Sequence, residues 1–203
     1  MIAQAIWQEK TFDGYAVQDP DDLYNAKALI LWGGEDIATS LYNEQSVYSF
    51  SKWGLSRRDS IERDLVWRAV DLGIPILGVC RGAQLLCALD GGKLWQHVDN
   101  HAGQDHNVTL ASGETIRTNS LHHQMMRPLA HNEVLGWSSD VLSPVKLSEL
   151  GQHLSKDPEP EIVYFPKMKA LGVQGHPEYT GKTAEGLRKF TKQLFNDLFK
   201  VQL

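Results

Sequence analysis

Two short apolar runs alternate with two stretches of helical periodicity in the first half of the chain. Residues 27–32 end at a Gly-Gly pair, and residues 74–79 follow a glycine. Such short apolar runs are typical of strands buried on both faces of a parallel sheet. Apolar positions recur at helical spacing over residues 61–70, with Asp59 as the expected cap, and residues 81–89 predict a second helix. This order predicts an α/β fold, a three-layer sandwich with a mainly parallel central sheet.

The rest of the chain gives weaker patterns. We expect a short strand at residues 2–7, a long surface loop with one helical turn at 35–57, strand pieces at 108–110 and 114–118, a polar loop at 148–160, a closing pair of strands at 162–165 and 170–174, and a final amphipathic helix from residue 183. Neither a repeat nor a linker is visible, so residues 1–203 are expected to form a single domain.

Composition and charge narrow the classes of function. The chain has 203 residues and a formal net charge of −5, which argues against a nucleic-acid partner and against an anionic membrane surface. Its two cysteines exclude a disulfide-rich scaffold. The first ten residues lack a secretory pattern, and the apolar run at 28–32 is far too short to span a bilayer. These features favour a cytoplasmic protein.

The clearest chemical motif is Gly78-Val79-Cys80-Arg81-Gly82, between the second apolar run and the second helix. A sharp strand-to-helix turn would lift Cys80 to the carboxyl edge of the sheet, and the flanking glycines would remove clashing side chains. The helix that starts at Arg81 points its free N–H groups at the sulfur, which favours the nucleophilic thiolate and can later hold an oxyanion. A buried structural cysteine in a tight turn is the other interpretation, and it is the expected one for Cys87, which lies among leucines.

A thiolate nucleophile needs a group that holds and delivers a proton. His176 is the best candidate, because it follows an apolar strand and precedes Pro177, which favours an extended backbone. In an extended chain Glu178 points the same way as His176, so its carboxylate can orient the imidazole as the third member of a triad. A loop histidine beside a surface glutamate is the alternative.

A glycine pair, Gly33-Gly34, directly follows the first apolar run. Glycines at the end of a parallel strand let the backbone approach a ligand closely, and ligands bind at this edge of such sheets. The N–H of Gly34 is therefore a candidate second oxyanion donor beside that of Arg81. A simple strand-ending turn would look the same.

Together these motifs resemble the class I glutamine amidotransferase-like superfamily, which has a flavodoxin-like α/β fold. The Cys-Arg-Gly form is most similar to its γ-glutamyl hydrolase branch, the peptidase C26 group. Three further stretches agree with that branch: Arg58-Asp59 with Glu62, His106-Asn107-Val108, and Asn119-Ser120-Leu121-His122-His123-Gln124. The matches span residues 27–178.

The resemblance implies a triad of Cys80, His176 and Glu178, with oxyanion donors at Gly34 and Arg81. It also implies that a γ-glutamyl group is bound by Gly33, Gln84, Ser120, Leu121 and His122. Cys80 would attack a γ-glutamyl amide, His176 would protonate the leaving amine, and water would release glutamate, with no metal and no other cofactor. One departure from relatives is Gly175, where many have Trp, and this is expected to open room near the base.

Several functions remain open on this fold. A stand-alone hydrolase of γ-glutamyl conjugates is favoured, and a glutaminase subunit that delivers ammonia to a separate synthetase is the alternative. A non-catalytic module is disfavoured because all three triad positions are filled. Thiol peptidases and glyoxalase-like enzymes place a histidine directly after the cysteine, where this chain has Arg81.

The histidines also raise the question of a metal site. His97, His101 and His106 are close in sequence, but Gly103 interrupts any helix, and no cysteine or paired carboxylate completes a known zinc pattern. We therefore expect no metal. His122 and His123 would point to opposite faces of an extended chain, so at most one of them lines a pocket.

Overall fold

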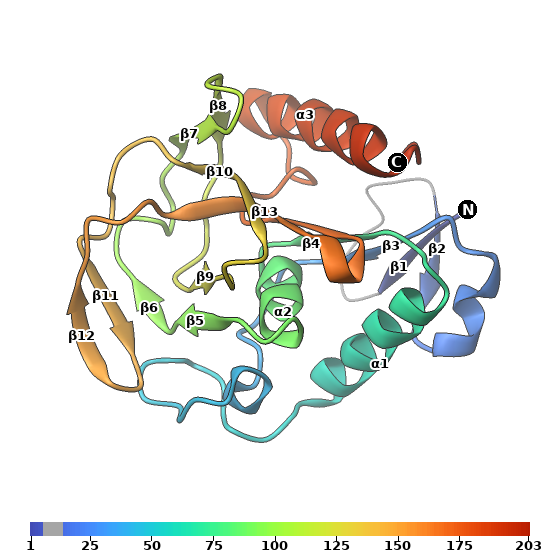
Figure 1. Ribbon diagram of the computed structural model, residues 1–203, viewed down its shortest axis with the longest axis horizontal. Helices are drawn as coiled ribbons and strands as arrows, with labels where there is room; N and C mark the ends of the chain where they lie inside the picture. Colours follow the sequence, from blue (N-terminus) through green and yellow to red (C-terminus); the bar gives the residue numbers. More distant parts are fainter. Residues whose placement is uncertain (6–13) are drawn as a thin grey trace.

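The computed structural model describes residues 1–5 and 14–203, and within them a nine-stranded sheet forms the centre of the molecule (Figure 1). Its strands, from one edge to the other, are β2 (Gly14–Val17), β1 (Ile2–Ala5), β3 (Ala28–Leu31), β4 (Ile76–Val79), β14 (Ala170–Val173), β13 (Pro160–Phe165), β10 (Glu133–Ser138), β7 (His106–Leu110) and β8 (Thr115–Thr118). The predicted strand at 2–7 is confirmed as far as residue 5, and its last two residues lie outside the described part of the chain.

The first five strands in this order run parallel, which confirms the expected α/β fold with its parallel core. Every residue of β3, β4 and β14 is buried, as the short apolar runs predicted. β4 lies between β3 and β14, and the carboxyl ends of these three parallel strands share one edge of the sheet. Cys80 therefore leaves β4 at the same edge where the segment before His176 leaves β14.

Antiparallel strands extend the other half of the sheet. β13 pairs with β14 through Ile162↔Val173, and β10, β7 and β8 follow it. The other described strands are β5 (Lys93–Trp95), β6 (His97–Val98), β9 (Met125–Arg127), β11 (Val145–Ser148) and β12 (Gly151–Leu154). β11 and β12 form a hairpin, so the prediction of a loop at 148–160 is wrong for residues 151–154. Half of these residues are exposed, and no apolar face marks them as a strand.

Helices cover both faces of the sheet and complete three layers. Figure 1 shows α1 (Arg57–Asp71) and α2 (Arg81–Leu89) on one face and α3 (Lys182–Phe199) on the other. Leucines of α1 and α2 pack with Leu29 and Leu31, whereas Leu187 and Phe195 of α3 pack with Ile30 on the opposite face. Three short 3₁₀ turns are η1 (Pro20–Asn25), η2 (Thr39–Tyr42) and η3 (Pro166–Met168).

The first turn of α1 corrects the predicted helix start. Ser56, not Asp59, is the N-cap: its hydroxyl accepts from Asp59 N, and the Asp59 carboxylate accepts from Ser56 N at 2.9 Å. This reciprocal arrangement is a capping box, which leaves the other oxygen of Asp59 for a second partner. Two reciprocal hydrogen bonds therefore fix the start of α1.

Residues 35–57 form a long segment with one helical turn, η2, as the sequence indicated. The side-chain oxygen of Gln96 accepts hydrogen bonds from the backbone N–H groups of Val47, Tyr48 and Ser49 at 2.9–3.3 Å, which fastens this segment to the body of the protein. Among the described residues, no helix is both long enough and apolar enough to cross a membrane.

Candidate active site

Cys80 lies at the turn between β4 and α2 in a conformation that side chains rarely adopt. Its φ is 49° and its ψ is −105°, and it is the residue that precedes the first turn of α2. The two flanking glycines are required by packing. A Cβ atom on Gly78 would lie 2.6 Å from the backbone of Gly82, and a Cβ on Gly82 would overlap the carbonyl oxygen of Leu31. The turn thus has the strained geometry of a nucleophile elbow.

His176 faces Glu178 and meets Cys80. The Nδ1 atom of His176 lies 2.7 Å from Glu178 Oε1, and the ring of Tyr179 stacks on the imidazole at 4.6 Å between centroids. A Cβ atom placed on Gly33 would lie 2.7 Å from His176 Cε1 and 3.5 Å from Cys80 Cβ, so both side chains converge over this glycine. The three residues of the expected triad are therefore close together.

Asn119 fixes the backbone of the histidine, a role that the sequence reasoning did not assign. Its Oδ1 accepts from His176 N at 2.7 Å, and its Nδ2 donates to His176 O at 2.9 Å. These two bonds join the segment after β8 to the segment after β14. Asn119 stood in a stretch that the sequence analysis had singled out, but only the tertiary structure shows what it contacts.

The surroundings of His176 favour its protonated form. Burial is the largest single effect and lowers the pKa of the imidazole, but contacts with the Cys80 and Glu178 side chains and their charges outweigh it and raise the pKa to about 10. The group is consequently an imidazolium at neutral pH. The imidazolium lies beside Cys80, which is also the residue that precedes the first turn of α2.

Two backbone segments that could hold an oxyanion lie next to this cysteine. One is the first turn of α2, where the N–H groups of Arg81 and its neighbours have no partner within the helix. The other is Gly33-Gly34, whose preceding carbonyls are held by Arg58: its Nη2 donates to Trp32 O at 2.9 Å and to Gly33 O at 3.0 Å. Gly34 has a φ of 143°, and a Cβ there would overlap the Arg58 guanidinium.

A buried cluster of charges lies behind both segments. The Arg81 guanidinium pairs with Asp59 and Glu62, and Arg58 Nε donates to the other oxygen of Glu62 at 2.9 Å. Arg81, Asp59 and Glu62 are all almost fully buried. The side chain of Arg81 therefore has a structural role, separate from the role expected of its backbone N–H.

The residues expected to bind substrate divide into two groups. Gly33 and Leu121 are placed to contact a ligand, Gly33 beneath the triad and Leu121 with 47% of its surface exposed. Gln84, Ser120 and His122 are buried. Gln84 Nε2 donates to Gln124 O at 3.2 Å, the Ser120 hydroxyl bonds to a backbone carbonyl, and His122 Nδ1 lies 2.9 Å from Gln124 O. The side chains of these three residues are therefore engaged with other parts of the protein.

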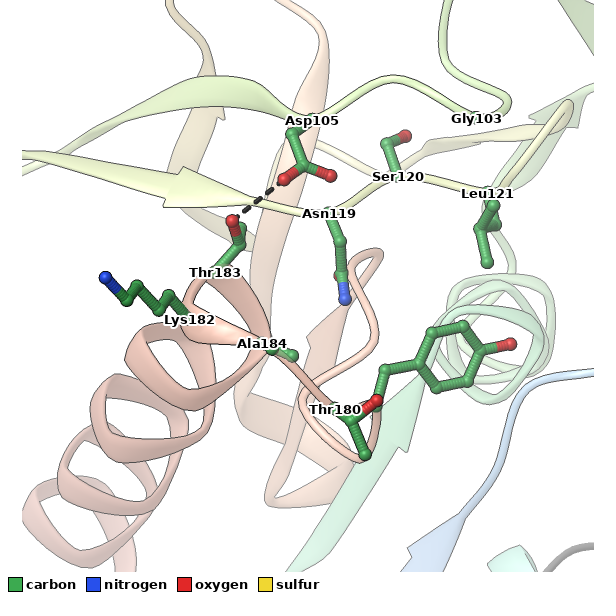
Figure 2. A pocket seen from close by; sticks show the side chains of 11 residues that line it. Gly103, Asp105, Asn119, Ser120, Leu121, Thr180, Lys182, Thr183 and Ala184 are labelled. Carbon is green, nitrogen blue, oxygen red and sulfur yellow. Dashed lines mark hydrogen bonds between the residues drawn. The ribbon is translucent and has the colours of Figure 1, made fainter.

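Two hollows flank the triad. One, of about 340 Å³, is lined by Asn119, Leu121 and the residues that lead into α3, and Figure 2 shows Thr183 at its wall, bonded to Asp105. The other, of about 400 Å³, is lined by Gly34 and by part of the 35–57 segment. Cys80 lines neither of these two hollows. Tyr179 lines the first and stacks on His176, and Gly34 lines the second directly after Gly33, over which His176 and Cys80 converge.

The space beside Gly175 is already filled. A Cβ on this residue would overlap Thr118 and would lie 2.8 Å from Leu187. The expectation that Gly175 opens room near the base is therefore wrong, because neighbouring side chains occupy the volume that a larger residue would take.

The parallel sheet, the cysteine elbow and the His-Glu pair define a class I glutamine amidotransferase-like protein. Solved structures of low sequence identity share the fold. A glutamine amidotransferase from Thermotoga maritima aligns with a TM-score of 0.54 at 17% identity, over 86% of this chain and 66% of that one. A putative GMP synthase subunit from Thermoplasma acidophilum aligns with the same score at 15% identity, over 92% of this chain and 84% of that one.

Sequence comparison defines the branch. Residues 21–142 match the Peptidase C26 family, and the chain belongs to that family. Protein NtpR of Enterococcus hirae is 31% identical over 82% of this chain and 74% of its own length. The γ-glutamyl-CDP-amidate hydrolase of Campylobacter jejuni is 31% identical over 53% of this chain and 48% of its own length. The resemblance inferred from the motifs is thereby confirmed.

Proposed function

We propose that this protein hydrolyses γ-glutamyl amide bonds through a cysteine thioester. The observation that carries the proposal is the convergence of three groups: Cys80 in its strained turn, His176 and Glu178. The side chains of all three are largely buried, which keeps water away from the ion pair, and α2 directs its N-terminus at the sulfur. The family membership and the name of the Campylobacter jejuni relative support a γ-glutamyl substrate.

The reaction has two halves. The Cys80 thiolate attacks the γ-carbonyl carbon, and the oxyanion is held by the N–H groups of Arg81 and Gly34. When the intermediate collapses, the carbon–nitrogen bond breaks, a thioester remains, and the leaving amine takes the proton of His176. Water then gives a proton to His176 and attacks the thioester, the carbon–sulfur bond breaks, and release of glutamate restores the thiolate and imidazolium pair.

Glu178 and Asn119 act by positioning the base. Glu178 holds the Nδ1 side of the imidazole, and this leaves Nε2 for proton exchange with the sulfur and the amine. Asn119 holds the backbone on either side of the ring. We expect Gln84 and the segment 120–122, which directly follows Asn119, to bind the α-amino and α-carboxylate groups of the glutamyl substrate.

A panel of γ-glutamyl compounds tests the proposal. Glutamine, γ-glutamyl conjugates of aliphatic amines and amino acids, and γ-glutamyl nucleotide amidates are incubated with the protein, and glutamate release is measured. We expect at least one to be cleaved by the wild type and by Cys87→Ala, and none by Cys80→Ala. Cys87 is the matched control, because burial raises the pKa of its thiol to about 12. Cleavage of a different acyl class alone, or full activity in Cys80→Ala, would refute the proposal.

A glutaminase subunit is the second candidate. The similarity in fold to a putative GMP synthase subunit favours it, since such a protein would hand ammonia to a partner. The two candidates differ in their response to a synthetase. A glutaminase subunit cleaves glutamine slowly alone and faster with its partner, whereas a stand-alone hydrolase cleaves its preferred conjugate at full rate without one.

A further inference from the structure

Three buried side chains outside the triad meet at one point. His101, which follows β6, and His122, in the segment after β8, both face Glu161 on β13. All three are almost completely buried. The Glu161 Oε1 atom lies 3.3 Å from His101 Nδ1 and 3.4 Å from His122 Nε2. These residues are far apart in sequence, so the fold alone brings them together.

The other nitrogen of each ring already has an acceptor. His101 Nε2 lies 3.1 Å from Glu159 Oε2, and His122 Nδ1 lies 2.9 Å from the carbonyl oxygen of Gln124. Because a carbonyl or a carboxylate only accepts, each of these outer ring nitrogens carries a proton. The two inner nitrogens face the Glu161 carboxylate, and in neutral imidazoles they are the atoms that can ligate a metal.

One hydrogen bond reaches the shared carboxylate, since His106 Nε2 lies 3.1 Å from Glu161 Oε1. It leaves the inner nitrogens of His101 and His122 and the Oε2 atom of Glu161 buried and, within the described residues, without a hydrogen-bond partner of acceptable geometry. Unsatisfied buried polar atoms are rare and costly. A cation bound by the two imidazoles and the carboxylate would satisfy them.

We propose that His101, His122 and Glu161 bind a zinc ion. Zinc takes imidazole and carboxylate ligands at about 2.0–2.2 Å in a tetrahedron, which places neighbouring ligand atoms about 3.3–3.5 Å apart. The observed separations of 3.3 and 3.4 Å match this spacing. The second oxygen of Glu161 is buried and has no hydrogen-bond partner among the described residues.

The groups around these three ligands are those that a zinc site requires. A ligating histidine donates its other N–H to a carboxylate or a backbone carbonyl, as His101 does to Glu159 and His122 to Gln124 O. Glu159 is fixed in turn by the backbone N–H groups of Leu142 and Ser143, both at 2.9 Å. The ligand orientations are thus set before a metal binds.

The proposed ion has a structural role and does not take part in the acyl transfer. None of the three ligands belongs to the triad. The ion would join β13 to the segment that carries Asn119 and Ser120, and Asn119 holds the backbone of His176. The sequence reasoning set a metal aside because Gly103 interrupts any helix and because no cysteine or paired carboxylate completed a known zinc pattern; the missing carboxylate is distant in sequence. Glu161, which is 60 residues beyond His101, supplies it.

Metal analysis of the full chain, purified without a histidine tag, tests this inference. We expect about one zinc per chain, and after chelation we expect uptake of about one Co²⁺ with the visible absorption of a tetrahedral site. Glu161→Gln keeps the size of the side chain and should weaken Zn²⁺ affinity by more than about 100-fold. His131→Gln is the control, because His131 pairs with Asp90 outside the cluster.

If Glu161→Gln does not fold, X-ray absorption of the Co²⁺-loaded wild type decides the question. Two imidazoles and a carboxylate around the ion support the site. The proposed zinc site is overturned if the metal-free wild type fails to take up Co²⁺ or Zn²⁺, or if Glu161→Gln has unchanged affinity. The cluster would then be a buried network of proton-sharing groups without a metal. These readouts do not depend on γ-glutamyl hydrolysis, so the metal site and the proposed function can fail separately.

Discussion

Gly33→Ala tests whether the histidine and the cysteine must meet over this glycine. The added methyl would lie 2.7 Å from His176 Cε1, whereas ordinary contacts begin at 3.4 Å, so the ring or the loop must move by about 0.7 Å. The ring is confined by Glu178 on one side and by the stacked Tyr179 on the other. The backbone of Gly33 does not lie at positive φ, so the steric contact is the main perturbation.

A displacement of about 1 Å at a reacting group can cost about 100-fold in rate, so we expect kcat to fall by about 10- to 100-fold with a smaller change in KM. A second assay needs no substrate: the rate of Cys80 alkylation by iodoacetamide, followed by intact mass, should fall at neutral pH because the displaced imidazole no longer meets the sulfur. Gly54→Ala is the control, since a Cβ there meets nothing within 4 Å. Wild-type kcat and alkylation in Gly33→Ala would refute the predicted convergence.

Three further substitutions test the supports of the site. Glu178→Gln removes a charge that helps raise the pKa of His176 to about 10, so the alkaline limb of kcat/KM should move to lower pH by about 1–3 units; an unchanged profile would contradict the pairing. Glu62→Gln leaves Arg81 short of a buried partner and should lower the free energy of unfolding in urea by about 3–5 kcal/mol, and a loss under about 1 kcal/mol would exclude the ion pair. Ser56→Ala removes the helix cap and should cost about 1 kcal/mol in the same assay, with no effect on the pH profile.

Local patterns were enough to predict the edge of the sheet where the residues of the expected triad meet. Buried strands are short and apolar, and a cysteine between two glycines at a strand-to-helix turn is typical of a nucleophile elbow. The sequence separation of two residues between His176 and Glu178 also fixed their common direction. These features depend on near neighbours in the chain, and their expected positions were found in the structure.

The missed features depend on contacts between distant segments. Asn119 and His176 are 57 residues apart, and the partners of the Arg81 side chain lie about 20 residues before it. Similarly, His101 reaches Glu161 only because β13 passes beside it. The hairpin strand at 151–154 was missed for a different reason: its residues alternate between half-buried and exposed, so they lack a hydrophobic pattern.

The start of α1 sets the distance between two halves of the expected oxyanion site. Arg58 donates hydrogen bonds to the carbonyls before Gly34, while Asp59 and Glu62 pair with the Arg81 guanidinium. The start of α1 therefore contacts both segments of the expected oxyanion site. A tilt of this helix would therefore change the spacing of both segments beside Cys80. In the proposed reaction, α1 would influence the rate of acylation although it contributes no member of the expected triad.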